Sequence, residues 1–316
     1  MKIRLGYVAT ALRLQDCSPS KTTTLKNIQK INGYKNQVNR LINISFQNLE
    51  NTLRILKANF YDHIYIYRFS SRLIPLATHP QFLDWDYRQS LRNKMKEIGE
   101  YVQEKHMRVG FHPDHFTLLN SPIPEVQASS LRDLEFHTAV LEEMQLTGES
   151  KLVIHVGGKY NNKKAAIERF QEQFQQLPSN IKQLIILEND DRCFSAAEVL
   201  DICRELSIPM VLDLHHHQLL NHGESIDSLL PQIFNTWGTK TPKVHISSPR
   251  DEKDPRAHAD YVDVSTVTDF LEKVKPLNRE FDIMLEAKQK DLALLKLAAD
   301  LKEQGFNLPA NGEIIL

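Results

Sequence analysis

The chain alternates short, mostly apolar runs with longer segments in which apolar residues recur every three or four positions. The run Leu184–Leu187, for example, holds four aliphatic residues and is followed at once by Glu188. A strand exposed on one face would alternate apolar and polar residues, so an unbroken apolar run predicts a parallel strand buried on both faces. We expect eight such strands, at residues 3–8, 64–69, 107–111, 151–156, 184–188, 210–214, 243–247 and 283–286.

The segments between these runs are typical of amphipathic helices. In Phe46–Phe60, for instance, leucines and phenylalanines recur at helical spacing. Ser195, followed three residues later by Glu198, predicts a capping box at the start of a helix. Asp291 is expected to cap the last helix, which stops at Gly305. The eight expected helices cover residues 46–60, 91–102, 131–146, 165–177, 195–206, 228–237, 267–274 and 291–305.

This alternation runs through residues 1–316 without a Gly/Ser-rich or Pro-rich linker. It predicts one α/β domain, a single (β/α)8 TIM barrel, with its site in the loops that follow the strands. The alternative is a doubly wound open sheet divided into two domains. We disfavour it because the segment GYVATA, at the end of the first strand, lacks the GxGxxG spacing of a dinucleotide-binding turn.

Composition and charge narrow the class of protein. The formal net charge of −1 gives no overall indication of a nucleic-acid partner, but residues 17–49 hold five basic residues and no acid. The three cysteines show no CxxC spacing, so neither a disulfide framework nor a thiolate zinc site is expected. No apolar run approaches the roughly 18 residues of a membrane span, and MKIRLGYVAT begins with a strand pattern instead of a signal peptide. We therefore expect a soluble, intracellular protein without a membrane partner.

Side chains that can bind metals stand at the ends of six successive expected strands. Because the C-terminal ends of all barrel strands meet at one mouth, these side chains should form a ring there. Imidazoles and carboxylates without cysteine suit Mn²⁺, Zn²⁺ or Fe²⁺, and two or three such ions commonly serve phosphoester hydrolysis. The plainer interpretation is that the histidines only hydrogen-bond within a polar core. The six residues are His112, His155, Glu188, Asp213, His245 and Glu286.

Strand parity adds two expectations. Lys243 and His245 are two residues apart, so both point the same way, which places a lysine beside the metals. Its charge would repel the metals unless the amine were neutral or modified. In the sixth strand Asp213 and His215 share parity, and His216 does not. Parity therefore favours His215 as a ligand, unless the strand ends at Leu214.

Long motifs along essentially the whole chain resemble those of the UV damage endonucleases: LGYVATA, YRFSSRLIPLATHP, FHPDHFTLLNSP, IHVGGKY, LENDD, VLDLHHH, PKVHISSP, HADYVD and MLEAKQKD. The resemblance implies a manganese-dependent (β/α)8 enzyme that cuts DNA on the 5′ side of ultraviolet photoproducts after flipping the damaged nucleotides. It implies two or three Mn²⁺ ions, with Zn²⁺ or another divalent metal as the alternative. Ultraviolet-damaged double-stranded DNA is then the expected partner, and the expected state is a monomer.

The resemblance also implies a role for individual residues. Lys243 matches a lysine that carries a carboxylate modification, which would remove the repulsion noted above. His79 matches a histidine at the margin of the site, although its position alone is typical of an exposed loop. Together with Glu188, these two are the expected catalytic residues. By resemblance the metal ligands are His112, His155, Glu188, Asp213, His216, His245, His258 and Glu286, which selects His216 over His215 and adds His258.

Five residues are expected to contact the DNA or the lesion: Tyr7, His115, Phe116, Lys159 and Tyr160. The pair His115–Phe116 stands where the family usually has Gln followed by an aromatic residue, and that pair probes the gap left by flipped bases. The plainer interpretation is that Phe116 packs in the core. The basic residues of segment 21–40 and the lysines at 159, 163 and 164 are expected to face the phosphate backbone, with ordinary solvation as the alternative.

Two other functions fit part of this pattern. A sugar isomerase also binds two metals through His and carboxylate ligands in a (β/α)8 barrel, but it needs neither a basic rim nor an exposed aromatic wedge. A lesion-binding protein without turnover would need no complete ligand set. Nicking of ultraviolet-irradiated supercoiled plasmid with Mn²⁺ separates all three.

Overall fold

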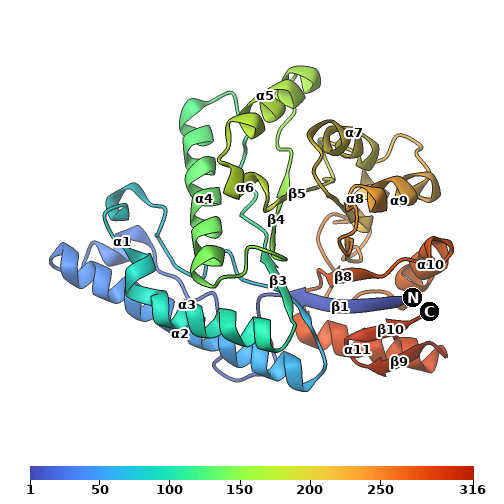
Figure 1. Ribbon diagram of the computed structural model, residues 1–316, viewed down its shortest axis with the longest axis horizontal. Helices are drawn as coiled ribbons and strands as arrows, with labels where there is room; N and C mark the ends of the chain where they lie inside the picture. The colour runs from blue at the N-terminus through green and yellow to red at the C-terminus, as the bar shows by residue number, and fades with distance from the viewer.

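The computed structural model describes residues 1–316. Eight parallel strands follow one another around a barrel, and β1 pairs with both β8 and β2, which closes it. This confirms the predicted (β/α)8 TIM barrel (Figure 1). The strands are β1 (Lys2–Val8), β2 (Ile66–Arg68), β3 (Arg108–Phe111), β4 (Lys151–His155), β5 (Ile185–Glu188), β6 (Met210–Asp213), β7 (Lys243–Ile246) and β8 (Phe281–Leu285).

A helix covers the outside of the barrel after each strand, and no helix is long and apolar enough to cross a membrane. The principal helices are α2 (Tyr34–Tyr61), α3 (Tyr87–Glu104), α4 (Pro124–Glu143), α5 (Lys163–Gln176), α7 (Ala196–Leu206), α9 (Ile226–Asn235), α10 (Val264–Val274) and α11 (Lys290–Glu303). Short turns complete the set: α1 (Leu25–Ile28), η1 (Pro80–Phe82), α6 (Ser179–Lys182), α8 (Leu214–Leu219) and η2 (Lys275–Leu277).

The helix termini test the capping predictions. The capping box of α7 is confirmed, because the Ser195 side chain accepts from the backbone of Glu198 while the Glu198 side chain accepts from the backbone of Ser195. The prediction that Asp291 caps the last helix is wrong. Gln289 occupies the cap position, and the buried Asp291 carboxylate accepts a hydrogen bond from the backbone N–H of Leu12 at 2.7 Å. Asp291 therefore ties α11 to the loop after β1.

Two elements differ from the sequence-based expectation in extent. α2 begins at Tyr34, twelve residues before the predicted start, and in Figure 1 it runs with α3 along one side of the barrel. A terminal hairpin, β9 (Asn307–Ala310) and β10 (Glu313–Ile315), was not predicted. β10 pairs antiparallel with β1, Ile315 facing Lys2, and extends the sheet beyond the barrel.

A small apolar layer lies inside the barrel beneath the strand ends. Val153, Ile186 and Val211 form a separate buried cluster with Trp237. Each of these three strand residues lies two positions before a polar strand end, so both point into the barrel. The indole of Trp237 donates a hydrogen bond to the carbonyl of Met210 at 2.6 Å, which fixes the ring in this layer. The barrel is therefore closed by packed side chains below its polar mouth.

Candidate metal centre

Glu188, the last residue of β5, is the common member of every cluster of potential metal ligands at the barrel mouth. Three trios have ligand atoms within 4.8 Å of one another: His112 with His155 and Glu188, Glu188 with Asp213 and His216, and Glu188 with His245 and Glu286. β4, β5 and β6 end in one of these side chains and β7 carries one, while His112 and Glu286 directly follow β3 and β8. Seven of the eight expected ligands therefore meet around one carboxylate.

The contacts of Glu188 show how closely the imidazoles surround it. His112 Nε2 lies 2.9 Å and His155 Nε2 3.7 Å from Oε2. On the other side His245 Nδ1 lies 2.7 Å from Oε1, and His216 Nδ1 lies 4.0 Å from it. The two oxygens of this one carboxylate thus face different histidines, which suits a carboxylate that bridges two ions.

Asp213 and His216 come together because β6 stops at Asp213. The Asp213 carboxylate caps α8 and accepts a hydrogen bond from the backbone N–H of His216 at 2.8 Å. His215 turns away: its Nδ1 pairs with the Ser247 hydroxyl at 2.9 Å and its Nε2 with the Pro255 carbonyl at 2.7 Å. Both nitrogens of His215 are occupied, so the geometry excludes the parity choice of His215 and places His216 in the cluster.

Glu286 follows β8 and has two cationic or imidazole neighbours. Arg68 Nη1 lies 2.5 Å and His245 Nδ1 3.2 Å from Glu286 Oε1. His258 enters from the loop before α10, where its Nδ1 contacts the Glu286 carbonyl and lies 3.9 Å from Oε2. His258 joins none of the three trios. Arg68 was missed from the sequence, although its inward parity at the end of β2 could have placed it at the mouth.

Burial and the close spacing of carboxylates and imidazoles shift the pKa values of the ring residues. Burial, opposed by His216 and reinforced by Glu188 and Glu286, raises the pKa of Asp213 to about 8. Burial would also raise the pKa of Glu188, but the surrounding imidazoles hold it well below its usual range. Burial lowers the pKa of His155 to about 4, so this imidazole is neutral, the form that binds metals.

Free donor atoms show that the ring fits divalent metal ions. His155 Nδ1, Asp213 Oδ2 and His245 Nε2 are buried without any hydrogen-bonding partner. Leaving such atoms unpaired costs free energy, and excess buried negative charge costs more. Cations bound among these imidazoles and carboxylates would relieve both costs. The set contains nitrogen and oxygen donors and no thiolate, a combination that suits Mn²⁺, Fe²⁺ or Zn²⁺.

Lys243 is buried one inward position below His245, at the level of Asp282 across the β7–β8 pair. Burial and the nearby Arg108 lower the pKa of its amine to about 7, against the opposing effect of Asp282. Lys243 therefore shares the inward face of β7 with His245 but lies toward the Arg108–Asp282 end of the strand, and its place beside the metals stays a prediction.

Two other expected site residues lie outside the ring. His79 is half-buried in the loop after β2, and its Nδ1 accepts from the backbone N–H of Gln81 at 3.1 Å, capping η1. Tyr7 points out of the barrel toward α2, fully buried, with its hydroxyl donating to Asn59 at 2.6 Å. In this structure Tyr7 has no surface to offer a nucleotide, so its expected contact with the lesion stays a prediction, as does the role of His79.

The loop after β3 carries His115 and Phe116, the pair expected to act as a wedge in the DNA, at the edge of an open hollow. His115 and Phe116 are 75% and 69% exposed, and their rings lie 4.1 Å apart between centroids. The interpretation that Phe116 packs in the core is therefore wrong. The hollow has a volume of about 370 Å³ and is lined by His112, His115, Arg68 and Glu286, so it joins the wedge to the ring.

The basic residues around the mouth differ in how far they are paired. The side chains at 21, 26, 30, 35 and 40 are all exposed, on α1, on the start of α2 and on the connections beside α1. The Ser20–Ser70 contact of 2.7 Å holds this basic segment beside the hollow, which both serines line. After β4, Lys159 and Tyr160 are exposed, and Arg169 lies over the Tyr160 ring. Lys163, by contrast, is bound to Glu198 at 2.7 Å and is not free for phosphate.

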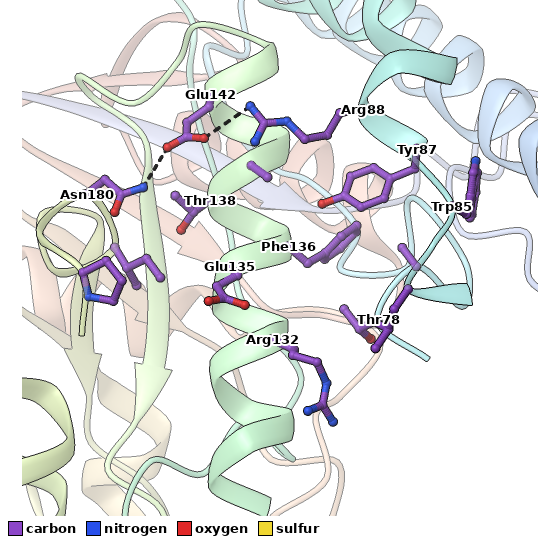
Figure 2. A pocket seen from close by; sticks show the side chains of 15 residues that line it. Thr78, Trp85, Tyr87, Arg88, Arg132, Glu135, Phe136, Thr138, Glu142 and Asn180 are labelled. Carbon is purple, nitrogen blue, oxygen red and sulfur yellow. Dashed lines mark hydrogen bonds and ion pairs between the residues drawn. The ribbon is translucent and has the colours of Figure 1, made fainter. Parts of the chain in front are cut away.

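A separate cavity of about 370 Å³ lies on the outside of the barrel along α4 (Figure 2). Trp85, Tyr87 and Phe136 form one wall, and Glu142 bridges Arg88 and Asn180 at its rim. None of the ring residues lines it. The chemistry expected from the sequence therefore belongs to the barrel mouth.

Known proteins match the chain over nearly its full length. The family model UV-endonuclease UvdE matches residues 3–314. The UV DNA damage endonuclease of Bacillus mycoides (strain KBAB4) is 46% identical over 303 residues, which is 95% of each chain. The protein of the same name from Bacillus cereus (strain 03BB102) is 44% identical over the same shares.

Solved structures agree with the sequence comparison. The crystal structure of SacUVDE superposes with a TM-score of 0.86 at 34% identity, covering 96% of this chain and 99% of that one. A D-psicose 3-epimerase from Clostridium cellulolyticum H10 reaches a TM-score of 0.50 at 13% identity over 75% of this chain and 79% of its own, which shows a shared fold alone. With the ring of imidazoles and carboxylates in place, the full-length matches show that this chain belongs to the UV-endonuclease UvdE family.

Proposed function

We propose that this DNA repair endonuclease nicks the phosphodiester backbone immediately 5′ of ultraviolet photoproducts, both cyclobutane pyrimidine dimers and 6-4 photoproducts, after flipping the damaged nucleotides. The observation that carries the proposal is the ring in which Glu188 faces three histidines within 3.7 Å. We further propose that residues 1–316 act as one intracellular domain and as a monomer. The sugar isomerase considered from the sequence is set aside, because the chain belongs to another family.

The ring residues and His258 would hold two or three divalent ions, Mn²⁺ in the first place and Zn²⁺ as the alternative. Such ions supply an activated water and neutralise the charge that develops on the leaving oxygen. Glu188, whose two oxygens face different histidines, would be central among the residues that hold them. Lys243, whose amine gives up its proton easily, would carry a carboxylate modification and so add a negative ligand instead of a repelling charge.

The residues beyond the ring would bind and open the DNA. The exposed basic segment on α1 and α2 would contact phosphates beside the hollow. His115 and Phe116 would enter the space from which the damaged nucleotides leave, and Lys159 and Tyr160 would contact the strand on the opposite side of the mouth. Arg68, held against Glu286, would face the scissile phosphate from the wall of the hollow. His79 and Tyr7 would act indirectly, by supporting the segments that carry these contacts: His79 caps η1, and Tyr7 donates to Asn59 of α2.

Nicking of supercoiled plasmid tests the proposal. Purified protein is incubated with irradiated or untreated plasmid, with Mn²⁺ or with a chelator, and the cut position is mapped on an end-labelled duplex with one dimer. We expect nicks only in irradiated plasmid, only with metal, and at the phosphodiester bond 5′ of the dimer. Binding of the damaged duplex without any nick would favour a lesion-binding protein and overturn the proposal.

A further inference from the structure

The N-terminal end of the barrel, opposite the metal-binding ring, contains a cluster of the half-buried Arg4 with the buried Arg108 and Asp282. Arg4 donates from Nε and Nη2 to the two oxygens of Asp282 at 2.7 and 3.1 Å, and Arg108 Nη1 donates to Oδ2 at 2.5 Å. Asp282 is fully buried, and the Arg108 side chain is only 6% exposed. Two guanidinium groups share the one carboxylate of Asp282, so at least one guanidinium keeps N–H donors that Asp282 does not take up.

The remaining donors of this cluster are also unused. Arg108 Nε is buried and has no hydrogen-bonding partner, and the protein offers none to Arg108 Nη2 or Arg4 Nη1. The Trp237 ring lies 5.4 Å from the Arg108 guanidinium carbon, which favours the charge but accepts no hydrogen bond in the guanidinium plane. Arg108 Nε is thus a buried charged donor without a partner, which is costly, while Arg108 Nη2 and Arg4 Nη1 remain available to an anion.

A cavity of about 490 Å³ opens beside the same two arginines. Ser150 and Thr241 line it as well, and neither hydroxyl forms a hydrogen bond within the protein, although Ser150 is only 2% exposed. At the rim, Glu149 and His106 are exposed and free to turn into solvent. The wall therefore offers guanidinium and hydroxyl donors around one space.

We propose that this cavity binds a phosphate group, either free inorganic phosphate or the phosphate of a small ester. Guanidinium groups match the oxygens of phosphate in paired hydrogen bonds, and the two hydroxyls add neutral donors. The volume exceeds the need of phosphate alone, which leaves room for the organic part of an ester. Arg108 is the first residue of β3 and His112 follows its last residue, so this site lies at the other end of the strands from the ring and is distinct from the proposed nuclease site.

Thermal unfolding with added ligand tests the site. At constant ionic strength, inorganic phosphate should raise the Tm by about 2–4 °C in a saturable way, whereas chloride should not. Thr241→Glu, which places a carboxylate beside the two arginines, should raise the Tm without ligand and abolish the phosphate response. Thr268→Glu on α10, away from the cavity, is the matched control and should keep the response. Ser150→Ala should fold normally and need several-fold more phosphate for half of the shift.

The alternatives give different results. A Tm rise that does not saturate and is equal in all variants is a general salt effect and overturns the proposal. A response that survives Thr241→Glu but disappears in Glu188→Gln places the anion at the metal ring and also overturns it. Glycerol 3-phosphate separates the two sources of phosphate: half-saturation at lower concentration than inorganic phosphate identifies an ester ligand, and at equal or higher concentration it identifies the free ion.

Discussion

Asp213 Oδ1 accepts a hydrogen bond from the backbone N–H of His216 at 2.8 Å, and its carboxylate thereby caps the helix that carries this histidine. The strand β6 ends at Asp213 and α8 begins with the next residue, so the alternation of a strand no longer applies. A helix advances about 100° per residue, and three residues bring the side chain back over the cap. His216 Nδ1 consequently lies 3.8 Å from Asp213 Oδ1, while His215 points to Ser247.

This relationship predicts different effects for two adjacent histidines. His216→Ala should lose bound metal and lower the nicking rate by roughly 10²-fold or more, because a ligand atom is removed. His215→Ala should keep the metal content of the parent protein but unfold at lower temperature, because Ser247 and the Pro255 carbonyl each lose a partner at a cost of about 1–3 kcal/mol. Elemental analysis of the purified variants, together with calorimetry, measures both. Loss of metal in His215→Ala alone would return the ligand role to that residue.

The barrel strands could be predicted within a few residues, because each is a short apolar run buried on both faces. The N-terminal half of α2 could not, since most of residues 34–45 are polar and only three of the twelve, Leu41, Ile44 and Ser45, are buried. The hairpin β9–β10 buries one residue on each strand, Leu308 and Ile314, which is too little for an apolar pattern. An apolar periodicity arises only where one face of an element is buried, and these segments bury too few residues to show one.

The ring could be predicted from strand ends alone, whereas its details depended on where one strand stops. Choosing His216 needed the end of β6, which a pattern of single residues does not define to one position. Arg68 escaped notice because a lone arginine has no characteristic spacing. The pairing of Arg4 with Asp282 joins residues 278 positions apart, and no local pattern connects them.

Glu188→Gln should abolish nicking while leaving the affinity for damaged duplex within several-fold. The amide keeps the size of the side chain but removes the charge that faces His112, His155 and His245. We expect a loss of roughly 10³-fold or more in the single-turnover rate with Mn²⁺, since the change removes an interaction needed in the transition state. Gel-shift titration with a dimer-containing duplex serves as the control. Near-normal cleavage by the variant would refute the central role of Glu188.

Binding to DNA should depend on salt through the basic segment. Replacing Lys26, Lys30 and Lys35 by Gln removes three exposed charges, and each lost phosphate contact should reduce the slope of log K against log salt by about 0.9. The matched control replaces Lys57, Lys182 and Lys302, which changes the net charge equally but lies toward the opposite end of the barrel. Fluorescence anisotropy at several salt concentrations gives the slopes. Equal reductions in both triple variants would show a general charge effect without contact.

Lys151 predicts a pH-dependent difference in stability. Burial and the neighbouring Lys240 lower its pKa to about 8, below the value of the unfolded chain, so the folded state disfavours the charged amine. Below pH 8 this costs stability in full, and the cost disappears as the pH rises toward about 10.4. Lys151→Met should therefore raise the Tm relative to the parent at pH 7, with the gain shrinking between pH 8 and 10. A gain that is constant over this range would mean that the effect comes from packing alone.

The exposed pair His115 and Phe116 gives the test of lesion recognition. Flipping nucleotides costs a few kcal/mol, and less where a lesion already weakens stacking, so a wedge that fills the opened space converts this difference into selectivity. Each aromatic contact with a base can add about 1–3 kcal/mol. Because the rings are mostly exposed and lie on the loop that follows His112, their removal should not disturb the core.

The double change His115→Ala, Phe116→Ala should accordingly weaken binding to damaged duplex by roughly 10- to 100-fold, change binding to undamaged duplex little, and leave the bound metal and the Tm unaltered. Phe46→Ala is a suitable control, since this phenylalanine is also exposed but lies on α2 beneath Lys94. Anisotropy titrations with matched damaged and undamaged duplexes measure the preference. An equal loss of affinity for both duplexes would assign the pair to general DNA contact, and a lower Tm with the damage preference intact would assign it to loop structure, because only a wedge that enters the opened duplex distinguishes the two DNAs.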